Sequence, residues 1–430
     1  MTNDRNNLEP IEPSAARRRA TVHPAMKIDL KDPDFHTRED KHEVFRNLRR
    51  TTPVYWNPEI DSSGFWAITR YKDVLRVVQD SETFSADVAN GGMRIFNIQD
   101  VTAAPCPHLL SMDPPQHTQL RKALQPLFSP AHLAHHQKRI LTRAKLIIDA
   151  IAAKATAETV GDIAVPFTLG LLIDLLAVPE SDSVHLLRWS NAFLADDDPD
   201  YLESVTARQQ MVRELDSYAL KLYEARNDAE TTDFASLLLG AKIDGHTMGF
   251  DTFSTNFGAF IIAVNETTRH TICSAIYAMT EFPEEKAKLL ADRSLIPLAA
   301  KEFIRWATPL MHVRRTAMRD TTIAGQSIRK GDKVVAWYSS ANRDETIWPD
   351  AAKLDVCRYG RSDSATHLAF GAGPHHCLGW RFAELQVSAI LDQLLQRLPD
   401  IRTTGAPRML RSNFISGIKE LRVVFTPETF

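Results

Sequence analysis

The sequence predicts a mainly α-helical protein with small β-sheets at its periphery. Two observations support this prediction. Between residues 114 and 298 almost every stretch is compatible with a helix, and apolar residues recur about every 3.6 positions. Short runs rich in β-branched and aromatic residues, separated by turn residues, lie before and after this region. The chain has no glycine-rich phosphate-binding or dinucleotide-binding pattern.

Composition excludes several classes of protein. The 430 residues carry 51 basic and 54 acidic side chains, a net charge of −3, and 44% of them are hydrophobic. A disordered chain or a small disulfide scaffold does not have this composition. The near-neutral charge argues against a dedicated nucleic-acid binder. A chain of this length can bury a core large enough to enclose a sizeable cofactor.

The cysteines and the apolar runs indicate where the protein works. Four cysteines with no CxxC spacing are expected to be free thiols in a reducing compartment. The polar N-terminus has no signal-peptide core, and no run reaches 18 apolar residues. We therefore expect a soluble, cytoplasmic protein that does not insert into a membrane.

The predicted elements follow in chain order. Residues 1–25 are expected to form a flexible polar tail, and residues 26–430 a single catalytic domain. The expected strands and helices are strands at 53–56 and 64–69, a helix at 73–79, a loop at 84–112, helices at 137–154, 166–177, 201–226, 251–280, 283–291 and 294–306, a β-hairpin at 316–337, a helix at 378–397 and strand-like alternation at 408–426.

The most specific motif is Phe370-Gly371-Ala372-Gly373-Pro374-His375-His376-Cys377-Leu378-Gly379. A thiolate before a helix faces the positive end of the helix dipole, and backbone N–H groups can donate to its sulfur. The glycines at 371, 373 and 379 allow a tight turn and the close approach of a flat ligand. This arrangement suits a cysteinate axial ligand to haem iron.

Two other interpretations of the motif stay open on the residues alone. Free cysteines are usually buried and inert, so Cys377 can be a core residue in a glycine turn. Zinc bound by His375, His376 and Cys377 is disfavoured, because adjacent residues rarely point at one metal and no second ligand pair has a matching spacing.

The pattern F-x-x-G-x-x-x-C-x-G resembles the haem-binding signature of cytochromes P-450, and the chain is identified as a member of their soluble bacterial class. Matches run in family order from about Trp56 to Leu421. The resemblance implies a cytochrome P-450 fold and haem b held by the Cys377 thiolate, with Phe370, Gly371 and Gly379 in the cofactor-binding loop.

Glu302 and Arg305 lie three residues apart on one expected helix and therefore face the same way. Taken alone, such a pair is usually a surface ion pair of little value, but the neighbouring residues are apolar and suggest burial. The resemblance pairs them with Arg358 in a structural network that braces the cysteine loop.

The resemblance also implies a set of residues that bind the haem propionates. They are His117, Arg121, Arg315 and His375, four cationic or donor groups for two carboxylates. His117 and Arg121 fall on one face of a helix that Asp113 is expected to cap.

The helix at 251–280 contains Ala263-Val264-Asn265-Glu266-Thr267-Thr268. An acid and two threonines inside an apolar helix cost helix propensity and desolvation. On the residues alone, a threonine bonded to its own helix beside a solvated glutamate is the simpler interpretation. The segment resembles the oxygen-activation motif of the family, in which Thr267 would hydrogen-bond dioxygen above the iron and Glu266 would relay protons.

One residue departs from that motif, because the family usually has glycine where this chain has Val264. An isopropyl group narrows the groove beside the helix and is stiff about χ1. We hypothesise that Val264 restricts the substrate pose or shifts the chemistry away from simple hydroxylation.

Family position also places a tentative substrate pocket, and its residues are mostly apolar, so a hydrophobic substrate is expected. The pocket residues are Phe96, Phe193, Phe260, Ala263, Val264, Leu310, Met311, Val313, Phe414 and Ile415. Arg94 and His312 are candidate anchors for a carboxylate or amide, although a place on the surface is equally compatible with the sequence.

The function implied by the resemblance is a haem-thiolate monooxygenase. It would insert one atom of O2 into a lipid, terpenoid, steroid or secondary-metabolite intermediate. Electrons would come from a separate ferredoxin and ferredoxin reductase docked near Cys377, with Arg381 as a candidate contact, and the protein is expected to be a monomer.

Two alternatives remain. The same fold can desaturate, couple or decarboxylate a peptide or carrier-bound intermediate, and Val264 favours that alternative. A non-catalytic haem sensor or carrier has no need of the proton relay that Glu266 and Thr267 suggest.

Overall fold

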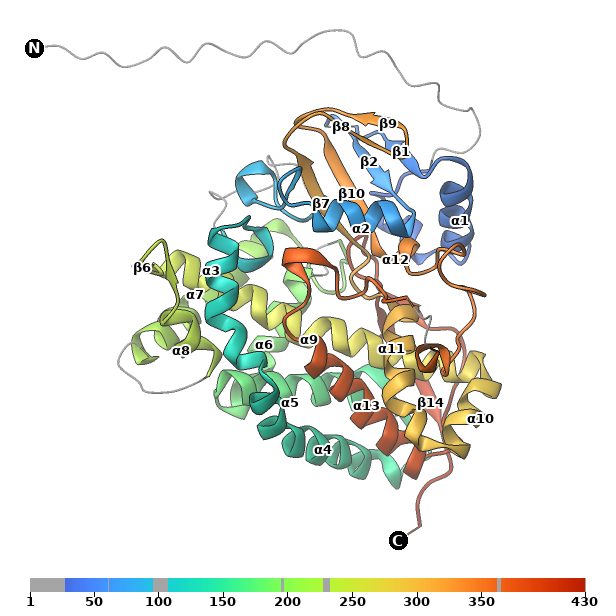
Figure 1. The fold of residues 1–430 in the computed structure, drawn as a ribbon. Helices are drawn as coiled ribbons and strands as arrows, with labels where there is room; N and C mark the ends of the chain where they lie inside the picture. The colour runs from blue at the N-terminus through green and yellow to red at the C-terminus, as the bar shows by residue number, and fades with distance from the viewer. Residues whose placement is uncertain are drawn as a thin grey trace, which may run out of the picture.

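The computed structural model describes residues 28–60, 62–95, 107–194, 197–226, 233–361 and 365–429. The predicted tail at 1–25 and the predicted pocket residue Phe96 lie outside these residues. Figure 1 shows strands β1, β2, β7 and β10 together with α1 and α2 at one end of the molecule, and most of the helices at the other. The described chain is mainly α-helical with small sheets, as predicted.

The described elements have the following bounds. The α-helices are α1 (Lys41–Thr51), α2 (Tyr71–Gln79), α3 (Gln116–Leu124), α4 (Pro130–Ala152), α5 (Val165–Leu176), α6 (Ser183–Leu194), α7 (Val205–Arg226), α8 (Phe234–Leu239), α9 (Phe250–Glu281), α10 (Pro283–Ala291), α11 (Ile296–Ala307), α12 (Tyr338–Ala341) and α13 (Trp380–Arg397). The strands are β1 (Val54–Asn57), β2 (Phe65–Ile68), β3 (Phe84–Ser85), β4 (Thr156–Glu158), β5 (Lys242–Ile243), β6 (His246–Thr247), β7 (His312–Ala317), β8 (Thr321–Ile323), β9 (Gln326–Ile328), β10 (Lys333–Trp337), β11 (Arg402–Thr403), β12 (Arg408–Met409), β13 (Ile418–Glu420) and β14 (Arg422–Val424).

The largest sheet has the strand order β1-β2-β10-β7-β3. Its central strand β10 pairs parallel with β2 and antiparallel with β7, so that Val335 lies opposite Ala67 on one side and Arg314 on the other. Both faces of β10 are buried, which agrees with its apolar run Val334-Val335-Ala336.

The predicted hairpin at 316–337 is a nested structure. Its outer strands β7 and β10 pair with each other, and a second small hairpin, β8 with β9, turns at Ala324-Gly325 between them. Both residues of that turn have positive φ, which explains the glycine.

Helix α9 is 32 residues long and crosses the helical part of the molecule (Figure 1). It packs against α5, α6, α7, α11 and α13. A helix covered by neighbours on most sides buries polar as well as apolar residues, and the buried polar ones, among them Glu266 and Arg269, need partners. Ala263 near its middle is nevertheless exposed, so open space adjoins the helix at that point.

Several helix predictions need correction. Helices α1 and α6 were not predicted as separate elements, although Val44, Phe45 and Leu48 of α1 carry a helical apolar spacing. Helix α4 begins at Pro130 rather than 137, because the Ser129 side chain accepts a hydrogen bond from the backbone of His132 and Pro130 fits the first turn. Helix α13 begins at Trp380, two residues later than expected.

One helical stretch, Thr159–Leu176, is apolar and long enough by composition to cross a membrane. Within the molecule, 72% of it is buried. A core helix passes the same test, so this stretch is weak evidence for a membrane span.

The cysteine loop, residues 370–379, packs tightly against α2 at Gly373. A Cβ at this residue would lie 2.8 Å from both Gln79 Cα and Val78 O, and its φ is +67°. Gly331 also has a positive φ, +86°, but an added Cβ would meet nothing within 4 Å. Gly373→Ala is expected to lower the free energy of unfolding by about 1–3 kcal/mol more than Gly331→Ala, because overpacking adds to the backbone strain.

Urea unfolding of both variants beside the parent protein measures this difference. Equal losses of stability would show that the loop does not pack against α2 as described.

Candidate functional site

The loop before α13 is shaped by two residues in the left-handed region. Gly371 has a φ of +68° and Gly373 of +67°, and the backbone N–H of Cys377 closes the turn by donating to the Phe370 carbonyl at 2.9 Å. Gly379 has an ordinary φ of −88°, so the backbone does not require glycine there. The predicted tight turn is therefore present, but it depends on two of the three glycines.

Cys377 is a free, partly buried thiol. Burial raises the pKa of Cys377 to about 11, although the backbone N–H of Gly379 and the charge of Arg121 lower it. The predicted backbone donor to the sulfur is therefore present, but desolvation outweighs its effect on the pKa. A bound metal cation deprotonates a coordinating thiol and would reverse this balance.

Glu302, Arg305 and Arg358 form one buried ionic network, the Glu302 network. Arg305 donates to both carboxylate oxygens of Glu302 at 2.8 and 2.7 Å, and Arg358 Nε donates to both at 3.1 Å. Glu302 and Arg305 are fully buried, which makes this pair unlike a surface ion pair.

The Glu302 network also fixes the chain that leads to Cys377. The two guanidinium groups donate to backbone carbonyls of Asn342, Pro349, Ala351 and Lys353. The Asn342 side chain accepts from the backbone of Leu368 at 2.7 Å, and the Leu368 carbonyl accepts from Gly371. The predicted bracing of the cysteine loop has a continuous hydrogen-bonded route.

The four residues predicted to bind the haem propionates lie close to one another. His117 and Arg121 come from α3, Arg315 comes from β7, and His375 belongs to the cysteine loop itself. The rings of His117 and His375 are 4.1 Å apart. Arg315 is buried and its charge acts on both rings, as does that of the half-buried Arg121. Burial and the charge of Arg315 lower the pKa of His375 to about 2, and burial and the charge of Arg121 lower that of His117 to about 4.

Neither ring nitrogen of His117 or His375 has a hydrogen-bond partner among the described residues, although all four atoms are buried. Unpartnered buried polar atoms are rare and need an explanation. Two neutral rings beside two arginines would be satisfied by an acidic ligand placed between them.

Asp113 does not cap α3, contrary to the prediction. Its carboxylate accepts hydrogen bonds from Ser85 Oγ and from the backbone N–H of Ala86 at 2.9 Å, and so ties the start of α3 to the end of β3. The first residue before α3 is Pro115, which has no side-chain acceptor.

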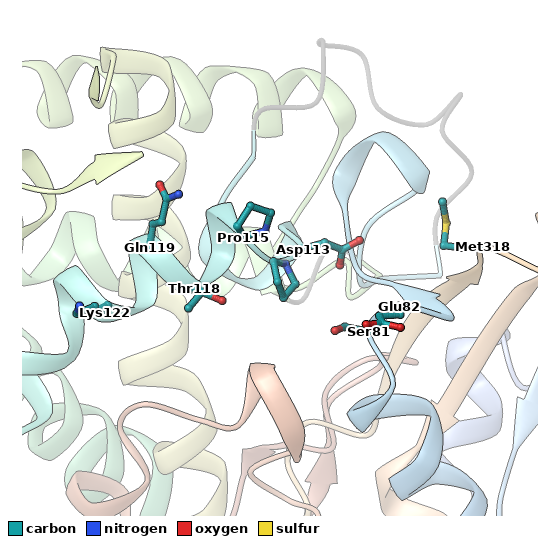
Figure 2. Close-up of a pocket in the computed structure, with 9 residues that line it drawn as sticks. Ser81, Glu82, Asp113, Pro115, Thr118, Gln119, Lys122 and Met318 are labelled. Atoms are coloured by element: carbon teal, nitrogen blue, oxygen red, sulfur yellow. The ribbon is translucent and has the colours of Figure 1, made fainter. Parts of the chain in front are cut away.

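Asp113 also borders a surface cleft of about 710 Å³ (Figure 2). The α3 side chains that line the cleft are Thr118, Gln119 and Lys122, and neither His117 nor Arg121 is among its lining residues. None of the predicted site residues lines it, so this cleft is separate from the candidate site.

Two neighbouring residues of α9 face in different directions. Thr267 is partly exposed and lies one turn after the exposed Ala263, to whose carbonyl its hydroxyl donates at 3.1 Å. The Glu266 carboxylate is only 1% exposed and is bound by Ser190 of α6 and by Arg269. Thr267 therefore borders open space, whereas Glu266 lies in a buried polar cluster and is not a solvated glutamate.

Burial alone would raise the pKa of Glu266, but the charge of Arg269 and the hydrogen bond from His270 hold it below its usual value. Ser190, Arg269 and His270 were missed at the sequence level. The sequence did carry a signal for Arg269 and His270, because they follow Glu266 at i+3 and i+4 on the same helix. Ser190 had none, because it belongs to another helix.

Only some of the predicted pocket residues lie in one cluster. Leu310, Phe414 and Ile415 pack in one apolar cluster with Leu194, Leu410, Met93, Tyr201 and Ile262, and we call it the distal cluster. Phe260 instead stacks on Phe234 of α8 with ring centroids 3.5 Å apart. Met311 and Val313 belong to two other core clusters, and Phe193 and Val264 border the main core.

The two candidate polar anchors lie beside Phe414. His312 is fully buried, with Nδ1 bonded to the Asn413 carbonyl at 3.1 Å, so it is not a surface residue. The Arg94 guanidinium lies 4.7 Å from the Phe414 ring and donates to the Phe193 carbonyl. Arg94 and Asn413 line a polar cleft of about 410 Å³.

The comparisons with known proteins agree with this geometry. Residues 290–399, which hold the Glu302 network and the cysteine loop, match the family model described as cytochrome P-450. Linalool 8-monooxygenase of Pseudomonas putida is 39% identical over 93% of this chain and 99% of its own. The chain belongs to the cytochrome P-450 family. Members of this family bind haem with a cysteine thiolate as axial ligand, and the chain is accordingly a monooxygenase.

Further relatives of this cytochrome P-450 cover nearly the whole chain. A methyl-branched lipid omega-hydroxylase of Mycobacterium tuberculosis is 31% identical over 94% of this chain and 96% of its own. The structure of cytochrome P-450 CYP268A2 from Mycobacterium marinum, in complex with pseudoionone, has a TM-score of 0.86 and 33% identity, covering 94% of this chain and 100% of its own. The predicted fold class is thereby confirmed.

The residues present fit a haem group. The thiol of Cys377 needs a cation to ionise, the unpartnered rings of His117 and His375 beside two arginines need an acidic ligand, and open space lies over Ala263. An iron porphyrin with two carboxylates meets all three requirements.

The Glu302 network yields a stability prediction. Glu302→Gln leaves two buried arginines without their counter-charge, so the variant is expected to lose about 3–5 kcal/mol of unfolding free energy. Glu43→Gln is the matched control, because Glu43 also pairs with an arginine at i+3 but both side chains are exposed. Denaturant unfolding of the two holoproteins compares them, and a Glu302 variant as stable as the Glu43 variant would contradict the structural role.

Proposed function

We propose that this protein hydroxylates a branched hydrophobic molecule of the terpenoid or lipid class, with Cys377 as the thiolate ligand of its haem. When bound, haem supplies the activation of O2 and the oxidation of a C–H bond. The net reaction is RH + O2 + 2 electrons + 2 protons → ROH + H2O. The observation that carries the proposal is the open face of α9 at Ala263 and Thr267, since that face adjoins the distal cluster through Ile262.

The side chains of this chain have separate tasks in the proposal. Cys377 holds the iron, and His117, Arg121, Arg315 and His375 hold the two haem carboxylates. The Thr267 hydroxyl donates to the Ala263 carbonyl at 3.1 Å, which leaves its lone pairs free to accept a hydrogen bond from water in the open space. Thr267 can thus order water there, and it can donate to oxygen when its hydroxyl turns away from the Ala263 carbonyl. Glu266 is the nearest acid along the helix.

The names of the relatives support the substrate class. The curated relatives act on linalool, a methyl-branched lipid and, for a protein of Mycolicibacterium smegmatis that is 32% identical, a steroid. A solved relative holds pseudoionone. The distal cluster suits such molecules, because its side chains offer apolar contact and few polar groups.

The source of electrons is also part of the proposal. We place a ferredoxin, reduced by a ferredoxin reductase, on the surface beside the cysteine loop of a soluble, cytoplasmic and monomeric protein. Arg381 is exposed there, with its guanidinium 4.2 Å from the Trp380 ring, and it follows Cys377 by four residues. A cation at this place attracts an acidic donor protein.

Substrate titration tests the proposed function. Addition of linalool, a methyl-branched fatty acid or a steroid to the ferric holoprotein is expected to shift the Soret band from low to high spin, because the ligand displaces water from iron. Turnover with NADH, ferredoxin and reductase is then expected to give a product one oxygen atom heavier, measured by mass spectrometry. A short peptide is the control ligand. No Soret band in haem-supplemented protein, or a product without added oxygen, would contradict the proposal.

Val264 generates a prediction about selectivity. The side chain borders both the main core and the open face of α9, where the family usually has glycine. Val264→Gly widens the groove and is expected to change the ratio of oxidation positions by roughly tenfold, the usual effect of one or two methyl groups in an apolar pocket.

Val264→Ile is the opposing variant and is expected to narrow the product range. The measurements are the ratio of products and the fraction of the consumed electrons that is recovered in product. If both remain at the parent values in both variants, Val264 does not control the substrate pose.

A further inference from the structure

His270 is a fully buried side chain that the proposed reaction has not used. It lies on α9 one turn after Glu266. Its Nδ1 accepts a hydrogen bond from the backbone N–H of Ile418 at 3.3 Å, and its Nε2 lies 3.5 Å from Glu266 Oε2. Because Nδ1 faces a donor, the proton of the neutral ring is on Nε2 and points toward the Glu266 carboxylate.

The Glu266 carboxylate has donors on both oxygens. Oε1 accepts from Ser190 Oγ at 2.8 Å and from Asn265 Nδ2 at 3.2 Å, while Oε2 accepts from Arg269 and His270. A buried carboxylate with this many donors stays ionised and has a fixed orientation. Its position therefore depends on the groups that hold those donors in place.

The other side of the His270 ring is covered by the turn Ser412–Ile418. A Cβ at Gly417 would lie 2.6 Å from the ring Cε1, so the backbone of this turn lies directly on the imidazole. The same turn carries Phe414 and Ile415 of the distal cluster. The His270 imidazole thus contacts Glu266 through Nε2 and the turn Ser412–Ile418 through Nδ1.

We propose that His270 is a positioning residue that ties the carboxylate of Glu266 to the turn Ser412–Ile418, which carries the predicted pocket residues Phe414 and Ile415. In this arrangement the turn keeps Glu266 in place beside Thr267, and a substrate that packs on Phe414 and Ile415 steadies the acid through the same ring. The inference rests on the proposed function, because it concerns how protons reach O2 in that reaction.

Other groups also act on Glu266 and must be held constant in a test. Arg269 of α9 is its ion-pair partner, and Tyr201, which follows α6, is within range of the charges of both Glu266 and Arg269. Asp198 also acts on Tyr201 and is neutralised by Lys419 at 2.8 Å. Arg269 also lies 3.4 Å from His270 Nε2, so its contacts change with His270, whereas neither Tyr201 nor Asp198 is among the described contacts of that ring.

Two amide variants separate the two contacts of His270. In His270→Asn the side-chain oxygen replaces Nδ1 and can still accept from Ile418, but no atom reaches Glu266. In His270→Gln the amide nitrogen replaces Nε2 and can still donate to Glu266, but no atom accepts from Ile418. Each variant is tested as the holoenzyme with O2, NADH and the ferredoxin system.

His270→Asn is expected to lower product formed per O2 consumed by about 3- to 30-fold, the range found for residues that act through another group. Its acid limb of kcat against pH should move to higher pH, because the hydrogen bond from His270 lowers the pKa of Glu266 and its loss therefore raises that pKa. His270→Gln should keep the parent pH profile but lose product yield.

Gly417→Ala, which presses on the ring from the turn, should behave like His270→Gln. Gly240→Ala is the control, because an added Cβ there makes only ordinary contacts with α8.

Hydrogen peroxide distinguishes proton delivery from simple damage. The reaction RH + H2O2 → ROH + H2O needs neither added electrons nor added protons, so the variants should approach the parent rate with peroxide. Parent-like yield and pH profile with O2 in both His270 variants would overturn the inference, as would an equal loss with O2 and with peroxide. If the parent enzyme forms no product with either oxidant, the proposed function itself fails.

Discussion

The buried carboxylate of Glu302 is the constraint on which the site depends. It is removed from water together with Arg305 and Arg358, and such a group is stable only if every charge and donor has a partner. Those partners include backbone carbonyls between residues 342 and 353, so that irregular stretch has little freedom. Asn342 then passes the constraint to Leu368 and Gly371, and through them to the turn that presents Cys377.

The protein part of the site is electrically incomplete. On one side of the cysteine loop, two arginines lie beside two histidines that have no hydrogen-bond partner among the described residues. Within the loop, burial raises the pKa of the Cys377 thiol to about 11. A flat ligand with a metal cation at its centre and two carboxylates at its edge corrects both imbalances.

Helix α9 separates two environments that the reaction has to connect. Ala263 and Thr267 border open space, while Glu266, Arg269 and His270 lie in a buried polar cluster. A 3.6-residue period makes this separation unavoidable, because adjacent residues on a helix point about 100° apart. The contact of His270 with Ile418 joins the acid to a neighbouring segment, and this is the route that we propose.

The sequence by itself determined the features that depend on local spacing. Positive φ at Gly371 and Gly373, the common face of Glu302 and Arg305, and the helical character of α9 and α13 all follow from residues within one turn of each other. Tertiary structure decided what depends on distant segments. Ser190 meets Glu266 across 76 residues, and Asp113 bonds to β3 instead of capping α3. It also raised the pKa of Cys377, because desolvation depends on everything packed around the thiol and not only on the residues beside it in the chain.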